Sequence, residues 1–229
     1  LEVVTDDGIE VNLRRAADTT QGEAHSALEA AAAKLASMLP GNNTESEDSV
    51  WEELKPRLVP RLVTCAFAEE LKGTGRGELA TWPLGHGLLV ALQARFETRA
   101  RYIRSDEVEA WDLSEDAVYA MAISNLAMQS GAARFAALEV HGGPLVVART
   151  GDGLDSARLL LPSLGHVLEE HLGTRFLVAA PHRDTLLAAP DTDQGRELLR
   201  ERAGDLAARA PHAISAELFR VHQGTLVEA

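Results

Sequence analysis

The side chains best suited to chemistry gather in residues 151–189, in two polar groups separated by a predicted helix and an apolar strand. Six of them are candidate ligand-binding residues: Asp152, Asp155, Arg158, His182, Arg183 and Asp184. An arginine can hold a carboxylate or a phosphate through two parallel hydrogen bonds, and an aspartate can orient that arginine. This chemistry indicates a site for an anion, or an enzyme that acts on a small molecule or a phosphoester.

The same residue types also form structural ion pairs, which gives a second interpretation of this stretch. An Arg158–Asp184 pair or an Arg183–Asp155 pair would tie the start of a helix to the end of a strand. Both interpretations predict that the two polar groups meet in space. They differ in one respect, because a binding site needs an unpaired arginine in an open pocket and a structural bracket does not.

The sequence contains no complete catalytic or metal-binding constellation. His166 and His171 are five residues apart, so on a helix they point about 140° away from each other and cannot chelate one metal ion. Cys65 lies in an apolar run and is expected to be a buried, inert thiol. No metal, no cofactor and no catalytic residue is therefore assigned, and whether the protein is an enzyme stays open.

The local sequence predicts the elements that position the two polar groups. Asp155 is expected to be the N-cap of a helix, and Pro162 to kink that helix or to mark a second start. Gly173 fits the left-handed position after a helix end. The apolar run at 176–180 predicts a buried strand, which places residues 182–184 just beyond its carboxyl end, where ligands often bind.

The rest of the chain alternates hairpins and helices. Hairpins are expected in residues 1–13, 135–150 and 214–227, and a half-buried strand or hairpin in residues 88–103. Helices are expected in residues 22–39, 114–131 and 193–208. The helix at 114–131 begins with Ser114 as its cap and is apolar nearly all round, so both of its sides should be covered. Asn125 on its apolar surface is expected to bracket a neighbouring loop, and the alternative is a contact with a ligand. The predicted fold class is α+β, a mostly antiparallel sheet built from hairpins with helices packed on it, with one parallel pair left open.

Two further features concern organisation and charge. The acidic segment 41–48 is the best linker, so residues 1–40 are expected to form a subdomain or arm and residues 49–229 the main α+β domain. Four arginines, Arg95, Arg99, Arg101 and Arg104, form a basic patch. The favoured interpretation is a solvated sheet face paired with local carboxylates, and the alternative is an anion site.

The net charge and the cysteine content of the chain bear on its expected partners and location. The formal net charge of −13 over 229 residues argues against non-specific binding to nucleic acid or to acidic membranes. The single cysteine and the lack of a long apolar run favour a cytoplasmic protein. The chain begins at Leu1 rather than at a methionine, which leaves open whether residues precede it. The expected partner is an unknown protein or an anionic small molecule, and the oligomeric state is open.

Several stretches resemble the YtpQ-like family of uncharacterised bacterial proteins. They are RYIRSDEVEAWDLS, AISNLA, the segment 151–161, APHRD at 180–184 and LFRVHQGTL near the carboxyl end. The resemblance covers roughly residues 51–227 and implies a cytosolic mixed α/β domain, but it transfers no catalytic residue because the function of the family is unknown. The leading hypothesis is therefore a non-enzymatic binding or interaction module.

Overall fold

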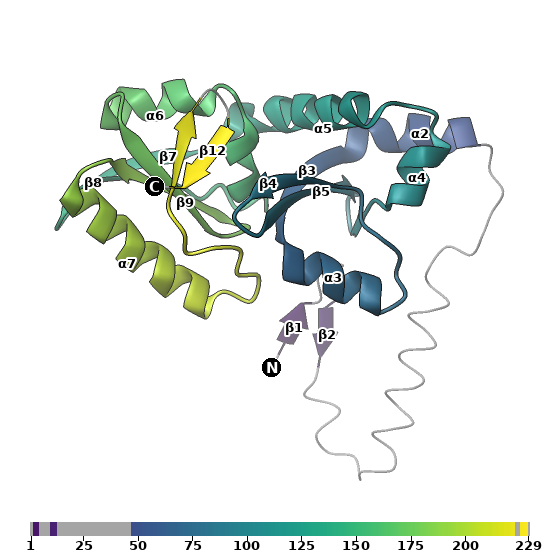
Figure 1. Cartoon of the computed structure of the whole chain (residues 1–229), viewed down its shortest axis with the longest axis horizontal. Coiled ribbons are helices and arrows are strands. Elements are labelled where there is room, and N and C mark those ends of the chain that lie inside the picture. Colours follow the sequence, from purple (N-terminus) through teal and green to yellow (C-terminus); the bar gives the residue numbers. More distant parts are fainter. Residues whose placement is uncertain (1, 5–9, 13–46, 223–224, 229) are drawn as a thin grey trace, which may run out of the picture.

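The computed structural model describes residues 2–4, 10–12, 47–222 and 225–228. Within them, helices pack on antiparallel sheets, so the predicted α+β class is confirmed (Figure 1). All pairs between the described strands are antiparallel, and the parallel pair left open by the sequence is not found among them. The long helical connections instead return the chain to strands that run opposite to their neighbours.

A four-stranded sheet forms the first half of the main body. Its strands are β3 (Leu58–Thr64), β4 (Thr81–Gly85), β5 (Leu88–Arg95) and β6 (Ala100–Tyr102). Strand β5 is central: it pairs along its whole length with β3, while β4 and β6 pair with its two ends on the other edge. Of the two alternatives for 88–103, a strand or a hairpin, the structure has the hairpin, but β5 is buried on both faces rather than half-buried.

Four helices accompany this sheet. They are α2 (Glu47–Leu54), α3 (Cys65–Gly73), α4 (Ser105–Ala110) and α5 (Glu115–Gln129), with a short 3-10 turn, η2 (Lys55–Arg57), before β3. Ser114 caps α5 as expected, since its Oγ accepts from the Ala117 N–H at 3.3 Å. Cys65 is exposed, not buried, because Thr64 ends the apolar strand and caps α3, which leaves Cys65 on the first turn of that helix.

Helix α5 corrects a second expectation. Its buried residues are Val118, Ala122, Asn125 and Leu126, and they face β3, but the opposite side is exposed. The sequence pattern failed here because alanine, serine and methionine occur on buried and exposed helix surfaces alike, so the low polarity of the outer side did not determine whether the same chain covers it. Asn125 does bracket a loop, as predicted: its Nδ2 donates to the carbonyl oxygens of Lys55 at 2.7 Å and Leu58 at 2.9 Å.

A six-stranded sheet forms the second half, in the spatial order β12-β11-β9-β10-β8-β7. Its strands are β7 (Phe135–Val140), β8 (Gly143–Ala148), β9 (Phe176–His182), β10 (Thr185–Pro190), β11 (Phe219–His222) and β12 (Thr225–Glu228). The hairpins predicted for 135–150 and 214–227 and the buried strand at 176–180 are confirmed. The polar residues 182–184 form the turn of a further hairpin, β9–β10.

Three helical segments pack on this sheet: the 3-10 helix η4 (Ser156–Leu160), α6 (Leu164–Leu172) and α7 (Asp193–Arg209). Pro162 separates η4 from α6, which confirms a second helix start, and Gly173 ends α6 with a positive φ of 77°. The helix predicted for 193–208 is confirmed, with Leu198 and Leu199 buried.

The two sheets share one hydrophobic cluster. Leu62, Leu88 and Val90 from the first sheet pack with Val178 and Leu186 from the second. A smaller cluster packs Leu154, in the loop that carries Asp152 and Asp155, against Val59 of β3 and Leu126 of α5, and so allows residues distant in sequence to form one site.

The amino-terminal residues are described only in part. Strands β1 (Glu2–Val4) and β2 (Glu10–Asn12) pair as predicted for a hairpin. The expected helix at 22–39 and most of the acidic linker at 41–48 lie outside the described residues; Glu47 and Asp48 belong to α2. Within the part of the chain that is described, no helix is both long and apolar enough to cross a membrane.

Candidate functional site

The loop between β8 and η4 carries the first group of candidate residues. Gly151 and Gly153 have φ angles of 84° and 75°, a left-handed conformation that glycine adopts without strain. The loop therefore curls tightly around Asp152, whose Oδ1 accepts from the Leu154 N–H at 3.0 Å. This turn presents the Asp152 carboxylate both to the protein interior and to a pocket.

Arg158 lies at the centre of this region and is completely buried. Its Nη1 donates to Asp155 Oδ1 at 2.8 Å and to Asp152 Oδ1 at 3.1 Å, and its Nη2 donates to Asp152 Oδ2. Its Nε donates to Ser130 Oγ at 3.1 Å, just after the end of α5. A guanidinium with all three nitrogens engaged is a structural bracket between α5 and the 150–155 loop.

Asp155 does not act as the predicted N-cap. Its backbone is helical, with φ −59° and ψ −44°, and its side chain makes no capping bond to the first turn. Its Oδ2 instead accepts from the Thr150 N–H at 2.9 Å, upstream in the chain. Its other oxygen, Oδ1, accepts from the buried Arg158, so both carboxylate oxygens are engaged and the ion pair outweighs the capping preference.

The electrostatics of Asp152 follow from the same contacts. Burial by itself would raise the pKa of Asp152, but hydrogen bonds from Arg158 and from the Leu154 N–H, together with the nearby charge of Arg95, hold the pKa below its usual value. Asp152 therefore stays ionised at neutral pH.

The second group of candidate residues, in the β9–β10 turn, meets the first group through the backbone. The Ser156 N–H donates to the Arg183 carbonyl oxygen at 3.1 Å, so the expected convergence is confirmed. The predicted cross pairs are wrong, however. Arg158 pairs with Asp152 and Asp155, and Arg183 Nε pairs with its neighbour Asp184 at 3.2 Å, because each arginine reaches carboxylates of its own chain segment, one to six positions away, before those of the other group.

Arg61, which the sequence analysis did not single out, joins the two groups. It lies inside β3, only 7% exposed, and its Nη1 donates to the Gly153 carbonyl oxygen. A Cβ at Gly153 would lie 3.3 Å from this Nη1 and 3.6 Å from Asp184 Oδ1. Burial lowers the pKa of Arg61, and the nearby charge of Arg183 acts in the same direction.

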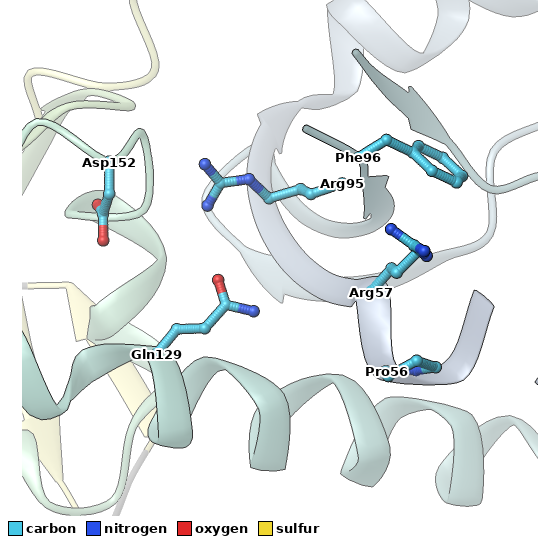
Figure 2. A pocket seen from close by; sticks show the side chains of 6 residues that line it. All are labelled: Pro56, Arg57, Arg95, Phe96, Gln129 and Asp152. Atoms are coloured by element: carbon cyan, nitrogen blue, oxygen red, sulfur yellow. The ribbon is translucent and has the colours of Figure 1, made fainter. Parts of the chain in front are cut away.

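An open pocket of about 550 Å³ lies beside this bracket. It is lined by Pro56, Arg57, Arg95, Phe96, Gln129 and Asp152. These residues come from η2, the end of β5, the end of α5 and the 150–155 loop, so four separate elements build it. Figure 2 shows the Arg95 guanidinium extending toward Asp152, with the Gln129 side chain below both of them in this view and Arg57 beside Phe96.

The two arginines of the pocket keep their donors available. Arg57 lies over the Phe96 ring, 5.0 Å from its centroid, and Arg99 lies over the same ring at 5.1 Å. This contact orients Arg57 through its π-face without using its N–H groups, and its buried Nε has no hydrogen-bond partner. Within the described part of the chain, neither Arg57 nor Arg95 forms an ion pair or a side-chain hydrogen bond.

A smaller pocket of about 220 Å³ lies at the β9–β10 turn. It is lined by His182, Asp184, Leu206, Arg209, Ala210, Pro211 and His212. His182 Nδ1 accepts from the Asp184 N–H at 3.2 Å, and burial lowers the pKa of His182, which keeps it neutral at pH 7. This pocket holds two of the six candidate residues, whereas the larger pocket holds only Asp152.

The arginines of the basic patch do not share one environment. Arg101 pairs with Glu107 at 2.7 Å and Arg104 with Asp106 at 3.1 Å, so the prediction of local carboxylate partners is confirmed for these two. Arg95 lines the larger pocket instead. Arg57, Arg61 and Gln129 carried no sequence signal that was used, although an arginine within an apolar strand segment marks Arg61 as unusual.

Comparison of the chain with family models, with curated proteins and with solved structures gave no match in any of the three.

Proposed function

We propose that the protein is a non-enzymatic module that binds a small anionic molecule in the pocket between Arg57 and Arg95. The observation that carries the proposal is that two guanidinium groups line one open pocket without a carboxylate or hydrogen-bond partner among the described residues. In a protein with net charge −13, carboxylates to pair with them are plentiful, so their unpaired state favours a ligand.

The size and lining of the pocket indicate what kind of anion fits. A volume of about 550 Å³ lies in the usual range of small-molecule sites. The anionic group belongs beside Arg57 and Arg95, where it accepts charge-assisted hydrogen bonds. Asp152 on the facing wall is ionised, so the part of the ligand near it must offer a hydroxyl or amino donor.

The alternative is an enzyme whose site comprises the 152–158 turn and residues 182–184. It has less support, because Arg158 is buried and bonded to both aspartates, and Arg183 is paired with Asp184. The two polar groups therefore act as a bracket that holds the wall of the pocket. We also propose a cytosolic location and membership of the YtpQ-like family, on the composition and the motifs given above.

Isothermal titration calorimetry tests the proposal, with inorganic phosphate, citrate and adenosine monophosphate as probes. We expect at least one probe to bind, and Arg57→Gln or Arg95→Gln to weaken it about 10-fold to 100-fold, since each removes a charge-assisted hydrogen bond of about 1.5–3 kcal/mol. Arg209→Gln is the control, because this exposed arginine lines the smaller pocket. If no probe binds, or if both pocket variants bind like the native protein, the proposal is wrong. Hydrolysis of adenosine monophosphate, followed by phosphorus NMR, would favour the enzyme.

A further inference from the structure

The outer face of α5 is exposed and carries no charge. We define it by seven residues on one side of the helix and its lead-in: Leu113, Ala117, Ala120, Met121, Ser124, Ala127 and Met128. Three of them are exposed large hydrophobic side chains, at 38% for Leu113, 36% for Met121 and 72% for Met128. In Figure 1, α5 runs along the top of the molecule with β3 below it, so this face points away from the sheet. A monomer gains nothing from exposing such a face.

The spacing along this face suits a partner helix. Ala117, Met121, Ser124 and Met128 follow one another at intervals of four, three and four residues, which is the pattern of a helix–helix seam. The small residues among them let a second backbone approach closely. The acidic residues Glu115 and Asp116 lie only at the beginning of the helix.

We propose that this face binds the same face of a second copy, with the two α5 helices antiparallel about a twofold axis. Such an axis between residues 122 and 123 places Met121 opposite Ser124 of the other copy, and Met128 opposite Ala117. Large side chains then meet small ones at both of these levels, as close packing requires. A parallel arrangement would instead oppose Met121 to Met121 and bring the acidic helix starts together.

The antiparallel arrangement also brings together residues outside α5, and the net charge of the protein predicts how dimerisation depends on salt. Leu113 would lie opposite Ala132, an exposed residue just after α5, which adds a third pair of large and small side chains. Each copy carries a net charge of −13, so the two repel at long range while the contact itself is uncharged. The dimer should therefore form more readily at higher salt, because salt screens that repulsion. This inference is independent of the proposed ligand pocket.

Sedimentation velocity of the full chain, at protein concentrations from about 1 µM to about 1 mM, tests the proposal over the range of weak interfaces. We expect a monomer–dimer equilibrium that shifts toward the dimer when salt is raised. Met128→Lys should abolish the dimer, whereas Leu138→Lys should not, since Leu138 is an exposed hydrophobic residue of β7. A monomer at every concentration would overturn the proposal, including the case in which other residues of the same chain cover α5.

A side-chain exchange tests the antiparallel register itself. Met121→Ser places a small side chain opposite the small Ser124 of the other copy, and Ser124→Met places a large side chain opposite the large Met121. Each single change should therefore weaken the dimer at least 10-fold. The double variant Met121→Ser, Ser124→Met restores the pairing of large with small and should recover dimerisation. If the double variant is as weak as the two changes combined, or if Leu138→Lys dissociates the dimer, the α5 interface is refuted.

Discussion

Removing the guanidinium of Arg158 is the sharpest test of the bracket. In Arg158→Met the buried Asp155 loses the cation that faces it, and Ser130 and Asp152 lose their bonds to that cation. The side chain of methionine fills much of the space, so the main effect is an uncompensated buried carboxylate. Breaking a buried ion pair in this way costs about 3–5 kcal/mol.

The loss of stability in Arg158→Met should lie at the lower end of the range for a broken buried ion pair, because both aspartates keep favourable surroundings. Asp155 keeps its hydrogen bond from the Thr150 N–H, and Asp152, 29% exposed, can be hydrated again. We therefore expect a loss of about 3 kcal/mol in the free energy of unfolding, which is a drop of about 6–12 °C in melting temperature for a chain of this size. Asp155→Asn added to Arg158→Met should recover part of the loss, because the amide keeps an acceptor and removes the charge.

Urea unfolding followed by tryptophan fluorescence measures the loss, since the protein contains three tryptophans. Arg209→Met is the matched control. Its ion pair with Asp205 is exposed, at 80% and 57% for the two side chains, so its loss should cost less than about 1 kcal/mol. Equal losses in the two variants, or a loss below about 1 kcal/mol for Arg158→Met, would refute the structural role of the buried arginine.

Three further predictions concern single positions. Asn125→Leu should cost about 1–3 kcal/mol in urea unfolding, because two backbone carbonyl oxygens near the start of β3 lose their donor; no measurable loss would contradict this. Gly195→Ala should lower the melting temperature although alanine favours helices, because a Cβ there would overlap the carbonyl oxygen of Pro190; a raised melting temperature would show that the overlap is relieved. Burial alone would raise the pKa of Asp191, but hydrogen bonds from two arginines hold it below its usual value, so its contribution to stability is full above about pH 4 and is lost as pH falls through the folded pKa. Between pH 5 and pH 3 the native protein should therefore lose more stability than Asp191→Asn, and parallel losses would contradict the pairing.

Local signals predicted most of the elements. The turn residues between alternating segments marked the hairpins, Ser114 marked the start of α5, and Gly173 marked the end of α6. These signals depend on a few adjacent residues, so the sequence contains all the information they need. The Asp155–Arg158 pair is also local, being three residues apart, and its spacing was a better guide than the distant pairs that were predicted.

The pocket could not be predicted in the same way. Arg57, Arg95, Gln129 and Asp152 come from four elements, and no periodicity links them. Their meeting depends on how the two sheets share a core, which is a tertiary property. Likewise, exposure of one side of α5 cannot be read from its sequence, because alanine and methionine occur on buried and exposed surfaces alike.

Asp152 belongs both to the buried ion-pair bracket and to the wall of the pocket. Variants of its two arginine neighbours, Arg158 and Arg95, can therefore separate the structural role of the bracket from the ligand-binding role of the pocket. The Asp152 carboxylate is held by the buried Arg158, and it also forms part of the wall of the pocket that Arg95 lines. Arg95→Gln should reduce anion binding and leave the free energy of unfolding nearly unchanged, because Arg95 has no bonded partner among the described residues. Arg158→Met should reduce both, since it releases the carboxylate that shapes the wall. A variant at Arg95 that destabilised the fold as much as Arg158→Met would mean that the pocket arginine is itself structural, and the ligand would have to bind elsewhere.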